Sequence, residues 1–281
     1  MRGLKKTVQF KYRISSILKF TFLSIYAAAT ISPLIWVLIS SLKTDNEIYA
    51  NPFGLPAKLI FKNYKEAWVG AQVGQSFFNS LLYSVLSVVC VVLLASMTSY
   101  VLARVRPNKW MYLFFTLGIM VPVHSVIIPL LVFLRSLGMV NTRPGIILAY
   151  IVSNLSFSIF VLVAFMRSLP KDVEEAARID GCKRVRMFFS IIIPISKPGL
   201  ATIGTFAFLN SWNDLLLSMV LTSSPHLRTL NLSCFNLRGQ YVQRYALICA
   251  GLIVLIVPVS IMYMLFQEQV IKGMTAGAVK G

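Results

Sequence analysis

Residues Phe77–Ala103 read FFNSLLYSVLSVVCVVLLASMTSYVLA, a continuous apolar run that contains no charged side chain. A helix needs about 20 such residues to cross the hydrocarbon core of a bilayer. Because the run is too long and too continuously apolar for a barrel strand, it predicts a transmembrane helix.

Five further stretches have the same character: Phe20–Leu42, Trp110–Leu134, Gly145–Met166, Gly199–Thr222 and Tyr245–Gln267. Together the six runs predict an all-α polytopic membrane protein with six transmembrane helices. Of the 281 residues, 57% are hydrophobic and 13% are charged, and the mean hydropathy is +0.75. A soluble domain carries roughly 25% charged residues, so the composition excludes an ordinary soluble protein.

The net charge of +18 bears on orientation rather than on nucleic acid, because the basic residues cluster between the apolar runs. Segment 1–19 holds six Lys or Arg residues and no acid, which predicts a cytoplasmic N-terminus. With six spans the inside segments are then 1–19, 104–109, 167–198 and 268–281. They carry 18 of the 27 basic residues, which favours an N-in/C-in topology.

This topology predicts three parts: a cytoplasmic basic N-terminus (1–19), a six-helix transmembrane domain (20–267) and a cytoplasmic C-terminal tail (268–281). The four cysteines follow no metal or disulfide spacing. His124 and His226 have no carboxylate or cysteine at ligand spacing, so no metal site is expected.

The longest internal loop, 167–198, has a helix-forming composition. Pro170 suits a first helical position, and the acids that follow it favour the positive end of a helix dipole. Gly181 suits the end of that helix. The loop therefore predicts two short helices joined at Gly181, along the membrane surface. One interpretation is that the loop is a binding surface for a partner protein, and the alternative is that it is an interfacial hairpin that binds anionic headgroups.

The spacing within the loop resembles a known motif. Glu175-Ala176-Ala177, then Gly181, Ile191 and Ile193-Pro194 resemble the EAA motif of bacterial ABC importer permeases, with isoleucine where the family usually has leucine before the proline. Other segments resemble the carbohydrate-uptake, MalG-like branch of these binding-protein-dependent inner-membrane components: 41–44, 63–68, 79–80, 212–214 and 273–281. The resemblance runs from about residue 20 to the end of the chain.

This resemblance implies a type I ABC importer permease fold with a cytoplasmic EAA coupling helix, in a subunit that performs no chemistry. Two groups of residues would contact the ATPases. In the loop these are Glu174, Glu175, Ala176, Ala177, Asp180, Gly181, Ile191 and Pro194. In the tail they are Gly277, Lys280 and Gly281.

The implied partners are two cytoplasmic ATPase subunits, a second non-identical permease subunit, an extracytoplasmic sugar-binding protein and membrane lipid. No cofactor would be bound by this chain, since ATP and Mg would lie on the ATPase subunits. The sequence has no GxxxxGK[ST] phosphate loop, consistent with that division. The implied location is the bacterial inner membrane.

Polar residues within the predicted spans suggest a substrate pathway. The candidates are Asn154, Asn210, Trp212, Asn213 and Asp214. Amides beside an aromatic ring suit a sugar, and an ionisable group inside a membrane is commonly functional. The alternatives are that Asp214 is a structural cap near the outer interface and that the amides join one helix to another.

The leading hypothesis is an importer permease that forms half of the path for a sugar or oligosaccharide. A proton-coupled secondary transporter would need several buried ionisable groups and an inverted repeat, and the sequence has one such acid and no clear repeat. A membrane enzyme using Asp214 or His124 as base lacks a second catalytic group. An importer of a non-sugar solute such as a glycerol phosphate stays open, although no Lys or Arg lies clearly within a span.

Overall fold

The computed structural model describes the backbone of residues 2–237 and 244–278, and within these the side chains of 16–237 and 244–268. Every regular element in those ranges is helical, as the sequence predicted. The chain forms two compact units, one of residues 1–70 with 237–253 and one of residues 71–236 with 254–281. The predicted tail contacts Lys280 and Gly281 lie outside the described residues.

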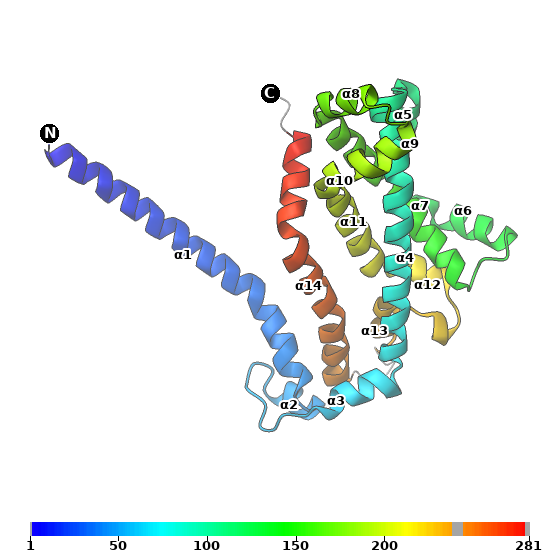
Figure 1. Ribbon diagram of the computed structural model, residues 1–281. Helices are drawn as coiled ribbons and strands as arrows, with labels where there is room; N and C mark the ends of the chain where they lie inside the picture. The colour runs from blue at the N-terminus through cyan, green and yellow to red at the C-terminus, as the bar shows by residue number, and fades with distance from the viewer. Residues whose placement is uncertain (1, 238–243, 279–281) are drawn as a thin grey trace. The chain divides into compact units, whose positions relative to one another are not determined.

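The first unit begins with the long helix α1 (Arg2–Ser41) and continues through α2 (Asp45–Ala50), α3 (Lys62–Lys65) and a π-helical turn, η1 (Glu66–Gly70). The start of α14 (Tyr245–Ala278) also belongs to it. Most of the apolar side chains of α1 between Ile17 and Leu38 are exposed, which is what a helix surrounded by lipid requires. In Figure 1, α1 is the blue helix that starts at the N-terminus.

The segment after α1 is held by hydrogen bonds. Asn63 donates from Nδ2 to the carbonyl oxygens of Ser41 and Lys43, both at 2.8 Å. Thr44 and Glu47 form a reciprocal capping box at the start of α2. Arg244 donates to both carboxylate oxygens of Glu66 and holds the pKa of that carboxyl below its usual range. The 41–44 and 63–68 segments noted in the sequence therefore belong to one folded unit.

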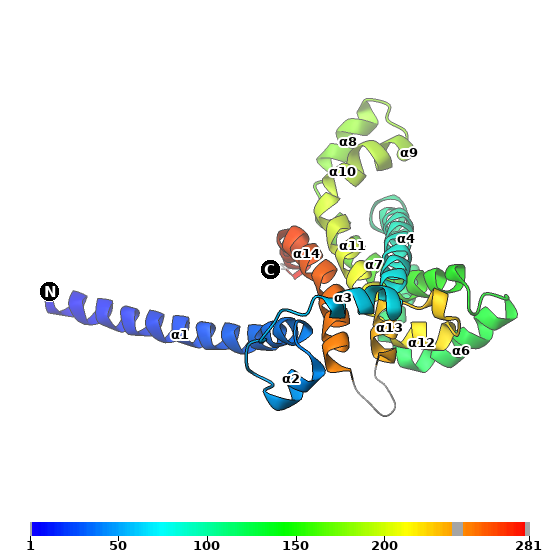
Figure 2. The same cartoon turned by 90° about the horizontal axis from the view of Figure 1, so that it is seen from below.

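The second unit is built on three helices that pack together, α4 (Val73–Tyr100), α7 (Arg143–Ser168) and α11 (Lys197–Trp212) (Figures 1 and 2). A π-helical turn, η2 (Val101–Val105), extends α4. Around them lie α5 (Lys109–Met120), α6 (Val123–Ser136), α12 (Leu216–Leu221), a 3-10 turn, η4 (Pro225–Leu227), α13 (Leu230–Asn236) and the rest of α14.

Two predicted spans are not single helices. The third, expected over Trp110–Leu134, consists of α5 and α6, which are bent by 102°. Pro122 lies at the bend, and a proline removes a backbone donor and disfavours helical geometry in the residue before it. The fifth, expected over Gly199–Thr222, ends at Trp212, and α12 begins after a break of three residues.

In the described residues, four helices are long and apolar enough to cross a membrane. They are Ser16–Ser41, Val73–Val105, Arg143–Ser168 and Tyr245–Glu268. The number rises to six if each of two bent pairs counts as one span; the second pair, Arg184–Ile195 with Lys197–Trp212, is bent by 77°.

Candidate functional site

The loop between α7 and α11 folds as two short helical segments joined at a glycine, as predicted. The first is α8 (Asp172–Ile179), and the second comprises α9 (Arg184–Met187), the π-helical turn η3 (Phe188–Ile192) and α10 (Ile193–Ile195). Gly181 has φ +74°, a conformation that L side chains rarely adopt, so glycine allows the chain to reverse between them. Pro170 precedes α8 by two residues and is not its first helical residue.

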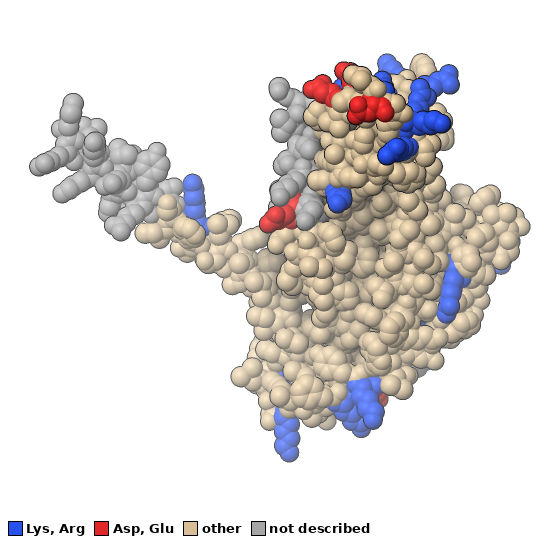
Figure 3. All heavy atoms as spheres, in the orientation of Figure 1, with Lys and Arg blue, Asp and Glu red and all other residues tan. Residues whose placement is uncertain are grey.

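The two faces of α8 differ in their exposure. Glu174 and Ala177 are buried, whereas Glu175, Ala176 and Asp180 are exposed. A carboxylate next to an alanine therefore lies on the open face, where a second protein can approach the backbone closely. Figure 3 shows acidic side chains gathered at this end of the second unit, with basic side chains beside them.

The buried acid Glu174 is held by Arg104, which the sequence reasoning missed. Glu174 Oε1 lies 3.3 Å from Arg104 Nε, and the two side chains are only 6% and 5% exposed. Arg104 also donates to the carbonyl oxygens of Met166 and Leu169. The guanidinium of Arg104, which belongs to η2, thus contacts both the end of α7 and the helix α8. The one available signal was an arginine directly after a long apolar run.

A second, weaker ion pair lies on the outer side of α8. Arg178 Nη2 is 3.7 Å from Glu174 Oε2, and the Arg178 side chain is 63% exposed. The two residues are four apart on the helix, and exposed i,i+4 pairs of this kind stabilise a helix only weakly. The position of α8 therefore depends mainly on Arg104.

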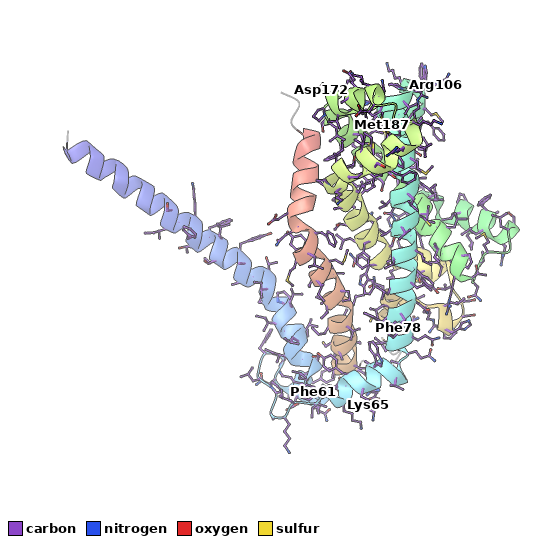
Figure 4. All side chains as sticks on the ribbon, in the orientation of Figure 1. Phe61, Lys65, Phe78, Arg106, Asp172 and Met187 are labelled. Carbon is purple, nitrogen blue, oxygen red and sulfur yellow. The ribbon has the colours of Figure 1, made fainter. Side chains whose placement is uncertain are left out.

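The second half of the loop is anchored by apolar packing. Met187, Phe188 and Ile192 are buried against side chains of α7 and α11. Ile191 is half-buried beside them, and Pro194 is exposed within α10. Figure 4 shows Asp172, Met187 and Arg106 at one end of the helical bundle. The loop is consequently a firmly attached body rather than a free surface hairpin.

A polar pocket lies farther along the bundle, with a volume of about 240 Å³. Its lining is formed by Tyr150, Ser153, Asn154, Asn210, Ser211, Asp214, Val123 and Leu217. Three of the five predicted pathway residues are therefore present. Asn210 donates to Asn154 Oδ1 at 3.0 Å, and Tyr150 donates from its hydroxyl to Asp214 Oδ2 at 2.9 Å. Tyr150 was not predicted, because it lies within an apolar run.

Two predicted pathway residues lie elsewhere. Trp212 is fully buried, stacks on Phe208 with ring centroids 5.5 Å apart, and donates from Nε1 to the Leu255 carbonyl oxygen. Asn213 is exposed and does not line the pocket. Trp212 therefore acts as a packing residue in this unit.

Asp214 has a structural role in addition to its place in the pocket. Its carboxylate accepts from the backbone N–H groups of Leu217 and Ser218 at 3.2 and 3.0 Å, and so satisfies free donors at the start of α12. Within the described residues no group of three or more His, Cys, Asp or Glu side chains is placed to hold a metal ion. The pocket therefore offers hydrogen-bond donors and acceptors, with Asp214 as its one charged side chain.

The sequence of this chain matches one family model and is similar to those of several transport proteins. A family model described as "Binding-protein-dependent transport system inner membrane component" matches residues 91–275. The diacetylchitobiose uptake system permease protein NgcG of Streptomyces coelicolor is 37% identical over 259 residues, which cover 91% of this chain and 86% of that protein. The trehalose transport system permease protein SugB of Mycobacterium tuberculosis is 34% identical over 253 residues, with coverage of 89% and 92%.

Solved structures show the same fold. A chain of a bacterial ABC transporter involved in the import of the acidic polysaccharide alginate superposes with a TM-score of 0.82 at 23% identity, and the match covers 91% of this chain and 96% of that one.

Proposed function

Because this chain belongs to the family of binding-protein-dependent transport system inner membrane components, we propose that it forms half of the path by which an ATP-driven importer moves a neutral sugar or oligosaccharide. The chain is a permease subunit of an ABC importer, and ATP hydrolysis belongs to a separate subunit. Family membership favours this function over a proton-coupled secondary transporter.

The observation that carries the proposal is the arrangement of α8. The helix is short, is fixed to the bundle by the buried Arg104–Glu174 pair, and leaves Glu175 and Ala176 exposed. A lever that transmits motion must be stiff and firmly attached at its base. Closure of an ATPase pair against the exposed face would therefore move the helical bundle, which opens the path alternately to each side.

The proposed contacts with the ATPases are the residues of the EAA motif and its surroundings. Exposure of Glu175, Ala176, Asp180 and Pro194 supports direct contact. Glu174, Ala177 and Ile191 support that surface from within the chain. Gly277, in the last turn of α14, and the two tail residues Lys280 and Gly281 are proposed to contact the same pair.

The proposed topology has six spans, with α5 and α6 together as the third and α11 and α12 together as the fifth, and both termini in the cytoplasm of a bacterial cell. The ATPases would then meet α8 on the cytoplasmic side and would hold ATP and Mg. A second permease subunit would complete the path, and an external binding protein would deliver the cargo. A second solved structure similar to this chain, with a TM-score of 0.67, is a bacterial alginate ABC transporter in complex with an alginate pentasaccharide-bound periplasmic protein, which supports an external binding protein as a partner.

The proposal of a neutral sugar as cargo has two supports. Relatives are named for the uptake of diacetylchitobiose and of trehalose. In addition, the polar pocket is lined by amides and hydroxyls without a Lys or Arg side chain, whereas a phosphorylated solute is normally bound by cations.

The direct test is to purify the tagged chain from its own membranes in mild detergent and identify every stoichiometric partner by mass spectrometry. We expect an ATPase, a second multispanning permease and an external binding protein, whose bound ligand would then identify the cargo. A chain that purifies alone, under conditions that keep a characterised importer intact, would contradict the proposal.

We predict that Asn210→Leu lowers sugar uptake about tenfold, because it removes a donor that lines the pocket and leaves Oδ1 of the buried Asn154 without the hydrogen bond from Asn210. A buried acceptor left without its partner costs about 1–3 kcal/mol. The measurement is initial uptake rate against sugar concentration. The matched control is Asn213→Leu, which changes an exposed amide outside the pocket and should alter uptake less than about twofold. Equal effects of the two substitutions would refute a pathway role for Asn210.

A further inference from the structure

A second pocket, of about 240 Å³, lies beside the loop on the outer surface of α4, and no part of the proposed transport mechanism uses it. One wall comes from the end of α4 and from η2, and the other from α9 and η3. The apolar side chains that form these walls include Met97, Val101, Val105, Val185 and Phe189. Tyr100 and Phe188 form its buried floor, with ring centroids 5.3 Å apart. The pocket is thus a defined apolar groove.

Both walls contain irregular helix. The turns η2 (Val101–Val105) and η3 (Phe188–Ile192) are π-helical, and each lies beside the pocket. Single π-helical turns within helices are rare and are frequent at functional sites. Both of these turns contribute side chains to the lining of one groove.

The groove opens onto the apolar surface of a membrane-length helix. Val73–Val105 is long and apolar enough to span a bilayer. Leu93, Leu94, Met97 and Val101 recur on it at helical spacing and are each 45–54% exposed. Side chains three and four apart share one face of a helix, so this strip continues the groove along α4 into the hydrocarbon region.

The lining of the groove also contains a positively charged side chain. Arg184 is the one charged side chain in the lining. It is exposed, and in the part of the chain that the structure describes it forms no ion pair. Lys183 and Arg186 flank it in the sequence, and no acid occurs from Gly181 to Asn213. An apolar strip that ends in a positively charged side chain without an ion pair matches a molecule with a hydrocarbon tail and an anionic head.

We propose that this groove binds an anionic phospholipid, with one acyl chain along Met97 and Val101 and the phosphate at Arg184. Basic pockets at the cytoplasmic ends of transmembrane helices bind anionic headgroups in this way. The assignment to the cytoplasmic leaflet relies on the topology given under the proposed function. A lipid bound here contacts η3 and α9, and so it would brace the loop that carries α8.

The test is native mass spectrometry of the transporter, purified with its partner subunits from nanodiscs that contain equal amounts of phosphatidylglycerol and phosphatidylcholine with identical acyl chains. We expect phosphatidylglycerol to be retained selectively. Arg184→Gln should reduce that retention about fivefold, because one basic residue near an anionic surface is worth about 1 kcal/mol. Val101→Trp, which fills the groove from a partly exposed position, should reduce it similarly, and Arg184→Lys should retain most of it.

The matched control is Arg106→Gln, which removes an exposed positive charge at the same end of the bundle but outside the groove (Figure 4). Unchanged retention in this variant supports the site. Equal loss in Arg106→Gln and Arg184→Gln, or equal retention of the two lipids by the unaltered protein, would overturn it. Absence of an ATPase from the purified complex would count against the transport proposal alone, since lipid retention is read from this chain.

Discussion

Replacing Glu175 with lysine is expected to reduce sugar uptake to background while the chain stays in the membrane. Glu175 is exposed on α8 and lies next to the exposed Ala176, so the substitution changes the surface proposed to meet the ATPase without disturbing the buried face. Reversal of a charge at a protein interface costs several kcal/mol through like-charge contacts, which is enough to abolish coupling. The measurements are uptake into intact cells and the amount of chain in the membrane fraction.

The matched control for this substitution is Asp172→Lys, which reverses an exposed charge on the same helix outside the EAA motif. It should retain most of the uptake, because the loss of an acid from a first helical turn costs only about 0.3–1 kcal/mol. Normal uptake by a correctly inserted Glu175→Lys variant would exclude Glu175 from coupling.

Long apolar runs could be predicted from the sequence where the chain offers no internal break. The runs expected as spans over Phe77–Ala103 and Gly145–Met166 each lie in one continuous helical stretch, Val73–Val105 and Arg143–Ser168, that is long and apolar enough to cross a membrane. The prediction that the third and fifth spans are single continuous helices was wrong, because hydropathy is averaged over a window of residues. Pro122, and the carboxylate of Asp214 that caps a new helix, each act at a single position. Such local breaks leave the mean hydropathy almost unchanged.

The sequence was sufficient to predict which residues form the motif of the candidate site, but not which of their side chains are buried and which are exposed. Glu174 and Glu175 are neighbouring acids in a first helical turn, and the sequence alone does not predict which of the two side chains is buried. Only the fold shows that Glu174 is buried, because its partner Arg104 comes from a segment far earlier in the chain. The same applies to Trp212, Asn213 and Asp214, which are consecutive residues. Because α11 ends among them, they point to the core, to the surface and to the pocket.

The buried Arg104–Glu174 pair leads to the second large expected effect. Arg104→Met should destabilise the attachment of α8 by about 3–5 kcal/mol, because it leaves the Glu174 carboxylate buried without its main partner. The exchange of backbone amides in residues 172–179 should accelerate by at least about a hundredfold in hydrogen-exchange measurements on the assembled transporter. Uptake should fall strongly while ATP hydrolysis continues, because a loosely attached lever no longer transmits the motion of the ATPases.

Two further variants separate this role from a general loss of packing. Arg178→Met removes the exposed partner of the same carboxylate, and pairs of that kind are worth only about 0–1 kcal/mol, so both exchange and uptake should stay near normal. The double variant Arg104→Met with Glu174→Met replaces the ion pair by apolar side chains of similar size, which is often neutral for stability. It should therefore restore slow exchange in α8 relative to Arg104→Met. If the double variant exchanges as fast as the single one, Arg104 acts through its bonds to the Met166 and Leu169 carbonyl oxygens, and the ion pair is not the anchor of the coupling helix.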